Sequence, residues 1–512
     1  FFFKQKTAYE IVDCDWSSDV CSSDLLNIGP THPATHGVFQ NIMEVDGERV
    51  VSTEQTVGYI HRAFEKLAER RPLYQITPIT DRLNYCSSPI NNMGWHITCE
   101  RFLKLEMPKR VDYLRVIIME LARISDHLIC NSIVGVDTGA YTGFLYVMQY
   151  RELIYEIYEE VCGSRLTTNI GRIGGFERNF TNTAFTKLEK FLNEYPKVLK
   201  EFENLFTRNR IFMERTQGTG AISAERALNY GFTGPNLRAA GVDYDVRVLQ
   251  PYSSYQDFDF KVPVGSTGDN YDRFLVRNAE MYESISIIKQ AYQKIQNFKG
   301  AEADIYHADV PEYYLPKKQD VYTKMEALIW HFKIIMGEID LPKGQIYSAV
   351  EGGNGELGFY LISDGGRAPY RLHFRRPCFI YYQAYEELIK HYSTVKTIFF
   401  GGGDIFLHWE HRQILNDLIA SGRSKDITLK YITNGNTLSN KDDIFDIWQN
   451  FKSVLIMFSI DGYGEPGEYW RYGGKWDIIE QNIKRCDSYK NINTYIHSTD
   501  RKSTRLNSSH SQ

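Results

Sequence analysis

Residues 111–133, with the sequence VDYLRVIIMELARISDHLICNSI, indicate the fold class of most of this chain. Apolar side chains recur along this segment every three or four residues, at Leu114, Ile117, Ile118, Leu121, Ile124 and Leu128. That spacing places them on one face of an α-helix. The pattern returns over residues 144–161, 184–206, 272–296 and 324–336, and two of these segments are followed by typical helix stops, Gly163 and Gly337. The sequence therefore predicts a core of long amphipathic helices.

Short β-strands are expected on both sides of this helical region. Residues 38–45 and 49–56 flank Asp46-Gly47, a dipeptide typical of the type I′ turn of a β-hairpin. Strand-like residues return over 344–374. We therefore expect residues 26–390 to form an α+β domain, with a helical core and small β-sheets near both ends.

The segment 391–499 has a different pattern. Strands are expected at residues 395–400, 428–433 and 453–460, with helical stretches between them. Strands that alternate with helices are typical of a parallel α/β unit.

Composition excludes several classes of protein. The 512 residues correspond to roughly three domains. Lys and Arg total 59 against 64 Asp and Glu, a net charge of −5, which argues against a nucleic-acid protein held by bulk positive charge. Hydrophobic residues make up 43% and aromatic residues 14%, enough for a large core. No apolar run approaches the ~18 residues that a membrane helix needs.

The cysteines do not form a metal-binding motif. They are Cys14, Cys21, Cys86, Cys99, Cys130, Cys162, Cys378 and Cys486. No two are separated by two residues, so the sequence has no CxxC pair and no zinc-ribbon or ferredoxin-like spacing. Scattered single cysteines are typical of reduced, packed thiols in a cytosolic compartment. We expect any iron–sulfur cluster or other metal to be held by a partner chain.

The stretch GPTHPATHG, residues 29–37, is the first candidate site. Its two histidines, His32 and His36, have the i, i+4 spacing that would suit zinc on a helix. Pro33 and Gly37 instead predict a loop, which could point the imidazole of His36 into a cavity. The residues alone leave a purely structural role open.

Two further candidates are Tyr85 in the stretch DRLNY and Asp137 in the stretch GVDTGA, where it is expected just past the helix over 111–133. A buried tyrosine often donates only to a backbone carbonyl, and such an acid is often only a cap or turn residue. Residues 353–358, GNGELG, formally match the GxGxxG fingerprint, but a strand-like segment follows instead of a helix. We therefore expect no dinucleotide site there.

Residues 26–390 resemble the D-type subunit of the bacterial NADH-quinone oxidoreductase, respiratory complex I. The stretches that carry the resemblance are GPTHPATHG, GYIHRAFEK, TPITDRLNY, GVDTGA, RIGGFE, ERTQGTG, NLRAAGVDYDVR, YDRFLVRNAEMYESI, EGGNGELGFYLISDGG and YRLHFRRPCF, in family order. The resemblance implies a fold similar to the large subunit of nickel–iron hydrogenases, without the paired metal-binding cysteines of those enzymes.

The resemblance also implies roles for individual residues. The residues concerned are His36 as a quinone-headgroup ligand with His32 nearby, Tyr85 as the quinone-site tyrosine, Asp137 as the acid that pairs with the loop histidine, and Arg62 and Arg82 as residues facing a [4Fe–4S] cluster in a neighbouring subunit. Imidazole and phenol suit this chemistry, because each can donate a hydrogen bond and then a proton to a reduced quinone.

The function implied is that of a complex I subunit that forms the quinone-reduction site, coupled to proton translocation. NADH would be used elsewhere in the complex. The expected partners are the cluster-bearing subunit, a C-type subunit and the membrane arm. The expected location is peripheral, on the cytoplasmic side of the bacterial inner membrane. A non-catalytic scaffold of a hydrogenase-like complex is the alternative for this region.

Residues 391–499 resemble part of a radical SAM barrel. Gly402, Gly403 and Asp404 stand where that family has a Gly-Gly-Glu motif that contacts S-adenosylmethionine. The family's CxxxCxxC is missing upstream, so we expect this fragment to be inactive. Both ends, residues 1–25 and 500–512, resemble peptides translated from sequencing-adapter DNA, and we expect them to be disordered. The chain would then be a chimera that is inactive by itself.

Overall fold

In the computed structural model the described residues are 24–46, 49–390, 397–400, 406, 409–420, 422–436, 438, 444–460 and 475–497. They divide into two compact units, with the boundary between residues 392 and 393. Each unit is described by itself.

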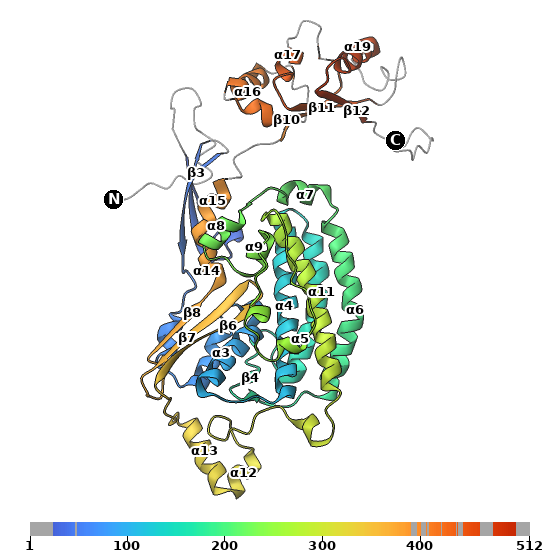
Figure 1. The fold of residues 1–512 in the computed structure, drawn as a ribbon. Helices are drawn as coiled ribbons and strands as arrows, with labels where there is room; N and C mark the ends of the chain where they lie inside the picture. Colours follow the sequence, from blue (N-terminus) through green and yellow to red (C-terminus); the bar gives the residue numbers. More distant parts are fainter. Residues whose placement is uncertain are drawn as a thin grey trace, which may run out of the picture. The chain divides into compact units, whose positions relative to one another are not determined.

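The first unit is built around long helices that run side by side in Figure 1. These are α4 Lys109–Asp137, α5 Tyr141–Cys162, α6 Asn182–Phe206 and α11 Asn270–Ile295. A further long helix, α3 Ser88–Leu103, is in contact with α4. The helices predicted over 111–133, 144–161, 184–206 and 272–296 are therefore confirmed. The helix α5 ends as predicted at Gly163, whose φ of 77° is in the left-handed region that glycine adopts readily.

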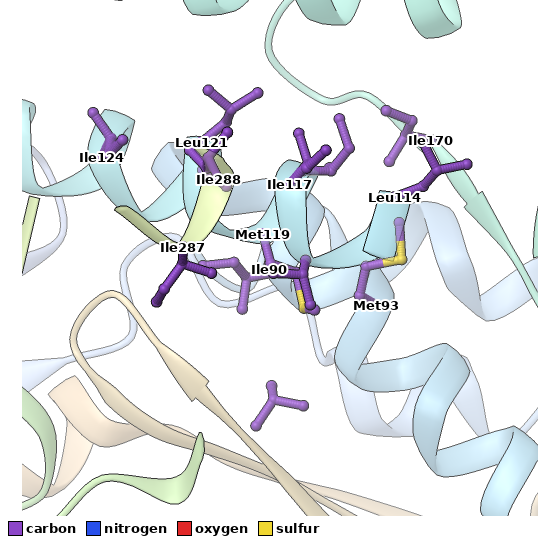
Figure 2. Packing of buried hydrophobic residues seen from close by; sticks show 14 of the residues in the cluster. Ile90, Met93, Leu114, Ile117, Met119, Leu121, Ile124, Ile170, Ile287 and Ile288 are labelled. Carbon is purple, nitrogen blue, oxygen red and sulfur yellow. The ribbon is translucent and has the colours of Figure 1, made fainter. Parts of the chain in front are cut away.

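The apolar face of α4 makes the centre of the core. Figure 2 shows Leu114, Ile117, Leu121 and Ile124 of α4 packed near isoleucines of α11 and residues of α3. Leu114, Leu121 and Ile124 are fully buried, as the helical spacing predicted. This burial holds α3, α5 and α11 against α4, with which each of them is in contact.

Two antiparallel sheets complete the α+β architecture. One has the order β1-β2-β3, with β1 Asp24–Ile28, β2 Phe39–Asp46 and β3 Arg49–Val57. The other has the order β6-β7-β8, with β6 Gly344–Gly352, β7 Gly355–Ser363 and β8 Arg371–Arg375. The two paired strands of the predicted N-terminal hairpin are confirmed. The GxGxxG-like motif at residues 353–358 forms the turn between β6 and β7 and the first part of β7. A strand therefore follows the turn, as predicted, and not a helix.

The remaining elements of this unit are short. They are α1 Phe64–Ala68, α2 Leu73–Thr80, α7 Arg210–Thr216, α8 Ala224–Asn229, α9 Gly234–Ala239, α10 Val246–Leu249, α12 Lys318–Thr323, α13 Met325–Ile335, α14 Pro377–Tyr381, α15 Tyr385–Lys390, β4 Gly171–Arg172 and β5 Gly175–Phe176, with single 3₁₀ turns at Pro33–Thr35, Tyr85–Ser87, Tyr255–Asp257, Gly300–Asp304 and Tyr382–Ala384. The strand β1 includes Asp24 and Leu25, so the expectation that the fold begins only after residue 25 was wrong. These two residues pair with β2 through backbone hydrogen bonds.

The second unit contains the parallel sheet that its pattern predicted. Its strands are β9 Thr397–Phe400, β10 Thr428–Thr433, β11 Ser453–Ser459 and β12 Ile492–His497, and every described pairing between them is parallel. The helices are α16 Trp409–Ala420, α17 Ile444–Trp448 and α19 Trp476–Cys486, with a 3₁₀ turn at Arg423–Asp426. Gly402, Gly403 and Asp404 lie outside the described residues, as do residues 1–23 and 498–512.

None of the helices within the described ranges combines the length and the apolar composition that a bilayer-spanning segment requires.

Two glycines allow α4, α5 and α6 to approach one another. A Cβ atom at Gly135 of α4 would lie 2.7 Å from the ring of Phe206 of α6, and one at Gly143 of α5 would lie 2.5 Å from the same ring. Phe206 is buried and packs against Phe202 and Phe274, with ring centroids 5.0 Å and 5.8 Å away. The ring therefore has little room to move.

Gly135→Ala and Gly143→Ala test this packing. Alanine is favoured over glycine within a helix by roughly 0.5–1 kcal/mol, but here its methyl group would overlap Phe206. We expect each variant to unfold with a free energy lower by about 1–3 kcal/mol. Thermal unfolding of the purified chain measures the change, and Phe206→Leu should restore part of it. Two variants as stable as the wild type would show that the helices are not held this closely.

Candidate functional site

The loop before β2 folds tightly and leaves His36 at the surface. The hydroxyl of the buried Thr35 donates to the backbone oxygen of His32 at 2.8 Å. The Nδ1 atom of His32 accepts a hydrogen bond from the Ala34 amide at 3.1 Å, so this imidazole caps the 3₁₀ turn that follows. His36 has a φ of 52° in the left-handed region, and its side chain is exposed. The predicted loop is confirmed, and of its two histidines it is His36 whose side chain makes no hydrogen bond with any described residue.

Tyr85 lies on a short turn whose backbone is held on both sides. The Oδ1 atom of Asn84 accepts from the Cys86 amide at 3.2 Å and caps the 3₁₀ turn Tyr85–Ser87. The Tyr85 side chain is 46% exposed. Partial burial, followed by the neighbouring Cys86, raises the pKa of the phenol. The turn therefore presents a protonated phenol at the surface.

Asp137 lies at the turn between α4 and α5. It is the last residue of α4, so the expectation that it follows the helix was wrong by a few residues, because Val134 and Val136 continue the helix beyond residue 133. The turn is fixed by Gly139, with a φ of 94°, and by Arg215, which donates to the Thr138 carbonyl at 2.7 Å. The Asp137 side chain is exposed and has no hydrogen bond or ion pair with any described residue.

The three candidates are not joined directly. No hydrogen bond or ion pair among the described residues connects His36, Tyr85 and Asp137, so the pairing of Asp137 with His36 is not formed here. One indirect path links the first two segments. The Phe39 ring of β2 lies 5.3 Å from that of Tyr382, and the adjacent Tyr381 donates to the backbone oxygen of Asn354 at 2.5 Å.

The path continues from the β6–β7 turn to the Tyr85 turn. The Nδ2 atom of Asn354 lies 3.4 Å from the Oδ2 atom of Asp126, a buried residue of α4. The same Asp126 oxygen accepts from Asn84 at 2.9 Å and from Ser87 at 3.2 Å. The Tyr85 turn is thus anchored to α4 and, through the β6–β7 turn, to the segment that packs on β2.

The predicted cluster-facing arginines are both exposed. Arg82 precedes the Tyr85 turn, and its charge partly offsets the effects that raise the pKa of Tyr85. Arg62 itself is not in the lining of a cavity of about 200 Å³ that its chain neighbours His61 and Ala63 line together with Glu65, Lys66, Arg371 and Arg376. A larger cavity, of about 510 Å³, has Tyr74, Arg172 and Tyr314 in its lining and does not include His36, Tyr85 or Asp137.

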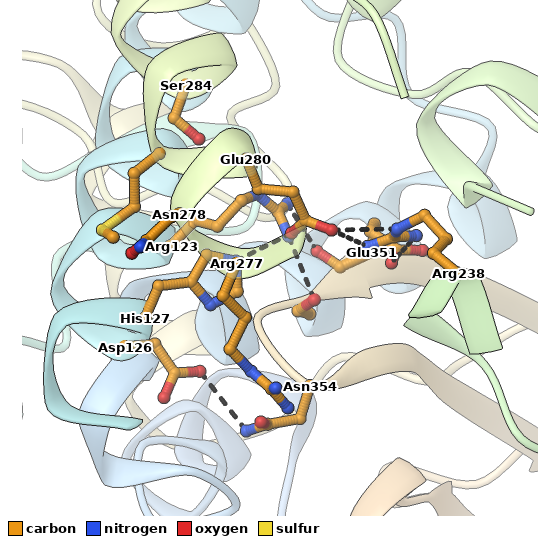
Figure 3. A network of polar contacts seen from close by, with 12 residues as sticks. Arg123, Asp126, His127, Arg238, Arg277, Asn278, Glu280, Ser284, Glu351 and Asn354 are labelled. Carbon is orange, nitrogen blue, oxygen red and sulfur yellow. Dashed lines mark hydrogen bonds and ion pairs between the residues drawn. The ribbon is translucent and has the colours of Figure 1, made fainter. Parts of the chain in front are cut away.

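Behind these segments lies a network of buried charges, part of which Figure 3 shows. Arg238 of α9 binds Glu280 of α11 at 2.5 Å and Glu351 of β6 at 2.9 Å. The other Glu280 oxygen lies 2.7 Å from Nε2 of His127, the α4 residue after Asp126. Burial alone would raise the pKa of Glu280, but Arg238 and His127 lower it well below its usual range. The network therefore ties four separate segments together by charge.

Glu120 occupies a second centre of the network. Its carboxylate pairs with Arg123 at 3.2 Å and with Arg247 at 3.1 Å, and it accepts from Tyr255 and Ser284, each at 2.6 Å. Burial opposes ionisation, yet the two guanidinium groups lower the pKa of Glu120 to about 2. Glu120 is therefore ionised at neutral pH although it is fully buried.

A family model described as the 49 kDa subunit of the respiratory-chain NADH dehydrogenase matches residues 137–405. The D-type subunit numbered 2 of the NADH-quinone oxidoreductase of Cytophaga hutchinsonii is 71% identical over 365 residues, which are 71% of this chain and 92% of that protein. The chain belongs to this family. The resemblance predicted from the sequence is thus confirmed.

Other relatives agree. The D-type subunit of Flavobacterium johnsoniae is 70% identical over 374 residues, which are 73% of this chain and 90% of the relative. The C/D-type subunit of Bdellovibrio bacteriovorus is 44% identical over 365 residues, which are 71% of this chain and 64% of that protein. The mixed helix and sheet architecture of the first unit is consistent with the family.

Within the described residues, no three His, Cys, Asp or Glu side chains gather in a group that could hold a metal ion.

Sequence reasoning missed the residues that hold the Tyr85 turn. Asp126 and His127 interrupt an otherwise apolar stretch of the helix over 111–133, and that interruption was the available signal. Buried charged residues in a helix need partners. Their partners come from segments far away in the sequence, which the pattern alone does not identify.

Acid unfolding tests the network. The pKa of Glu120 is about 2 in the folded chain, below the usual value of 4.5 expected after unfolding. Its ionisation therefore contributes stability that is complete above about pH 4.5 and is lost as the pH falls toward 2, in total about 3 kcal/mol. We expect Glu120→Gln to lower the free energy of unfolding at pH 7 by about that amount and to reduce the difference between pH 7 and pH 3.

Denaturant unfolding at the two pH values measures this change. Glu194→Gln is the matched control, because Glu194 is exposed on α6 and forms no hydrogen bond or ion pair with any described residue. A Glu120→Gln variant with the stability and pH dependence of the control would contradict the assignment.

Proposed function

We propose that this chain forms the quinone-reduction site of its NADH-quinone oxidoreductase, with His36 and Tyr85 as the groups that contact the quinone headgroup. The observation that carries the proposal is the Tyr85 turn, which presents a half-exposed phenol with a raised pKa. The exposed His36, held in a tight loop, supports it. Membership of the family indicates that the reaction is quinone reduction. The phenol of Tyr85 and the imidazole of His36 are groups that can take part in it.

The chemistry requires protons close to the quinone. Reduction adds electrons to the two carbonyl oxygens, and a doubly negative product is costly away from water. The phenol of Tyr85 donates a hydrogen bond to one oxygen and transfers its proton as charge develops. The imidazole of His36 does the same at the other oxygen, with His32 holding the loop. The protons are later replaced from solvent.

Asp137 acts on His36 in this proposal. A carboxylate beside the ring would stabilise the imidazolium form and move charge outward when His36 loses its proton. Both side chains are exposed, and neither has another hydrogen-bond partner among the described residues, which leaves them free to pair. This change in charge is the step that we propose couples quinone reduction to proton translocation in partner subunits.

In this proposal a [4Fe–4S] cluster held by a partner subunit would supply the electrons for quinone reduction, and Arg62 and Arg82 would face that subunit. Both arginines are exposed, and positive charge there favours the reduced cluster and quinone. NADH is oxidised elsewhere in the complex. The other proposed partners are a C-type subunit and the membrane arm, with this chain peripheral on the cytoplasmic side of the inner membrane.

Variants in the assembled complex test the quinone site. We expect Tyr85→Phe and His36→Ala each to lower NADH:quinone reductase turnover by about 10²-fold, because each removes a proton donor. NADH oxidation with ferricyanide, which does not need the quinone site, should stay unchanged. Tyr322→Phe is the control, since this tyrosine is 76% exposed on α12. Full quinone turnover in both site variants would overturn the proposal.

Asp137→Asn tests the coupling role. The amide keeps the shape of the side chain but cannot stabilise the imidazolium of His36 by charge. We expect quinone turnover to fall by about tenfold, with proton translocation lowered at least in proportion. Reconstituted vesicles that report both quantities provide the measurement. Undiminished reductase and pumping activity would refute the role of Asp137 and leave those of His36 and Tyr85 untouched.

A further inference from the structure

We infer that Asp126 is a positioning residue for Tyr85, and that the β6–β7 turn closes over Asp126 to keep it in place. This inference rests on the proposed quinone site and extends it to a residue that does not touch the substrate. It also gives a role to the GxGxxG-like motif at residues 353–358, which a strand follows and not a helix.

Asp126 holds the Tyr85 turn by hydrogen bonds. Asp126 lies on α4 and is only 5% exposed. Its Oδ2 atom accepts from Nδ2 of Asn84 at 2.9 Å and from the hydroxyl of Ser87 at 3.2 Å. One carboxylate oxygen therefore holds the turn on both sides of Tyr85. The backbone oxygen of Asn84 is held as well, by Nδ2 of Asn91 at 2.9 Å.

The turn between β6 and β7 lies directly against Asp126. Nδ2 of Asn354 reaches the same Asp126 oxygen at 3.4 Å, as Figure 3 shows. A Cβ atom at Gly353 would lie 2.0 Å from that oxygen, so only glycine allows the turn to come this close. Tyr381 in turn donates to the backbone oxygen of Asn354. Gly353 and Asn354 of the GxGxxG-like motif thus lie directly over the Asp126 carboxylate.

The charge of Asp126 also acts on Tyr85. Partial burial and Cys86 are the main effects that raise the pKa of Tyr85, and the Asp126 carboxylate raises it further. Arg151 and Arg82 act in the opposite direction. Burial, followed by the same carboxylate, raises the pKa of the Cys86 thiol to about 12. Asp126 therefore fixes the place of the phenol, and its charge favours the protonated form of Tyr85.

A purely structural role would have a different signature. If Asp126 only stabilised the fold, its replacement would lower quinone turnover equally with and without the Tyr85 hydroxyl. If it acts through Tyr85, the loss should disappear once that hydroxyl is absent. A double-mutant cycle separates these cases.

The experiment uses the assembled complex with Asp126→Asn, Tyr85→Phe and the double variant. We expect Asp126→Asn to lower quinone turnover by about tenfold in the otherwise wild-type complex and by less than about twofold in the Tyr85→Phe background. Ferricyanide-linked NADH oxidation should be unchanged throughout. Equal losses in both backgrounds, or no loss in either, would overturn the inference.

Ser87→Ala keeps the test decisive if Asp126→Asn fails to assemble. This variant removes one donor to Asp126 and leaves the charge in place, so we expect a smaller loss of about threefold, again only when the Tyr85 hydroxyl is present. Ser132→Ala is the matched control. Ser132 is buried, as Ser87 is, but it lies on α4 and donates to the backbone oxygen of Ile129 and not to Asp126. Full activity of Ser87→Ala would count against the inference.

The same cycle separates this inference from the proposed function. If Tyr85→Phe alone retains wild-type quinone turnover, the proposed role of Tyr85 fails. If Tyr85→Phe is impaired but Asp126→Asn acts independently of it, the role of Tyr85 stands and only the role of Asp126 fails.

Discussion

Buried charge is the constraint on which the first unit depends. Glu120, Arg238 and Glu280 are withdrawn from water, and an unpaired charge in such a place costs several kcal/mol. Each must therefore keep its partners, and those partners come from α4, α9, α11, β6 and the segment around Arg247. The pairing thus joins elements that lie far apart in the sequence.

The helix α4 connects these buried charges to residues at the surface. Asp126 and Asp137 are separated by about three helical turns, or about 16 Å along the axis, and so lie on the same face of α4. Asp126 is covered and holds the Tyr85 turn, whereas Asp137 is exposed at the end of the helix. One rigid element thus sets the place of a phenol and of a carboxylate that belong to different parts of the sequence. A reaction that needs proton donors in fixed places benefits from such an arrangement.

The sequence was informative where local patterns decide the outcome. The helical periodicity around Leu121, the strand patterns before and after Asp46-Gly47 and the stop at Gly163 all reflect local energetics. The structure confirms the helix, its packing, the two paired strands and the end of α5, whereas residues 47 and 48 lie outside the described residues. The parallel arrangement of the second unit was also predictable from strand and helix alternation. Asp126 was not recognised, because its role depends on Asn84, Ser87 and Asn354, which only the tertiary fold brings together. The roles of His36 and Asp137 came from family resemblance and not from any contact between them.

Photoaffinity labelling of the assembled complex with a photoreactive quinone analogue tests the central claim most directly. We expect cross-links on the peptides that contain His36 and Tyr85, and we expect them to disappear when unmodified quinone is present in excess. Cross-links that compete with quinone but map to another place, such as the cavity of about 510 Å³ beside Tyr74 and Tyr314, would contradict it.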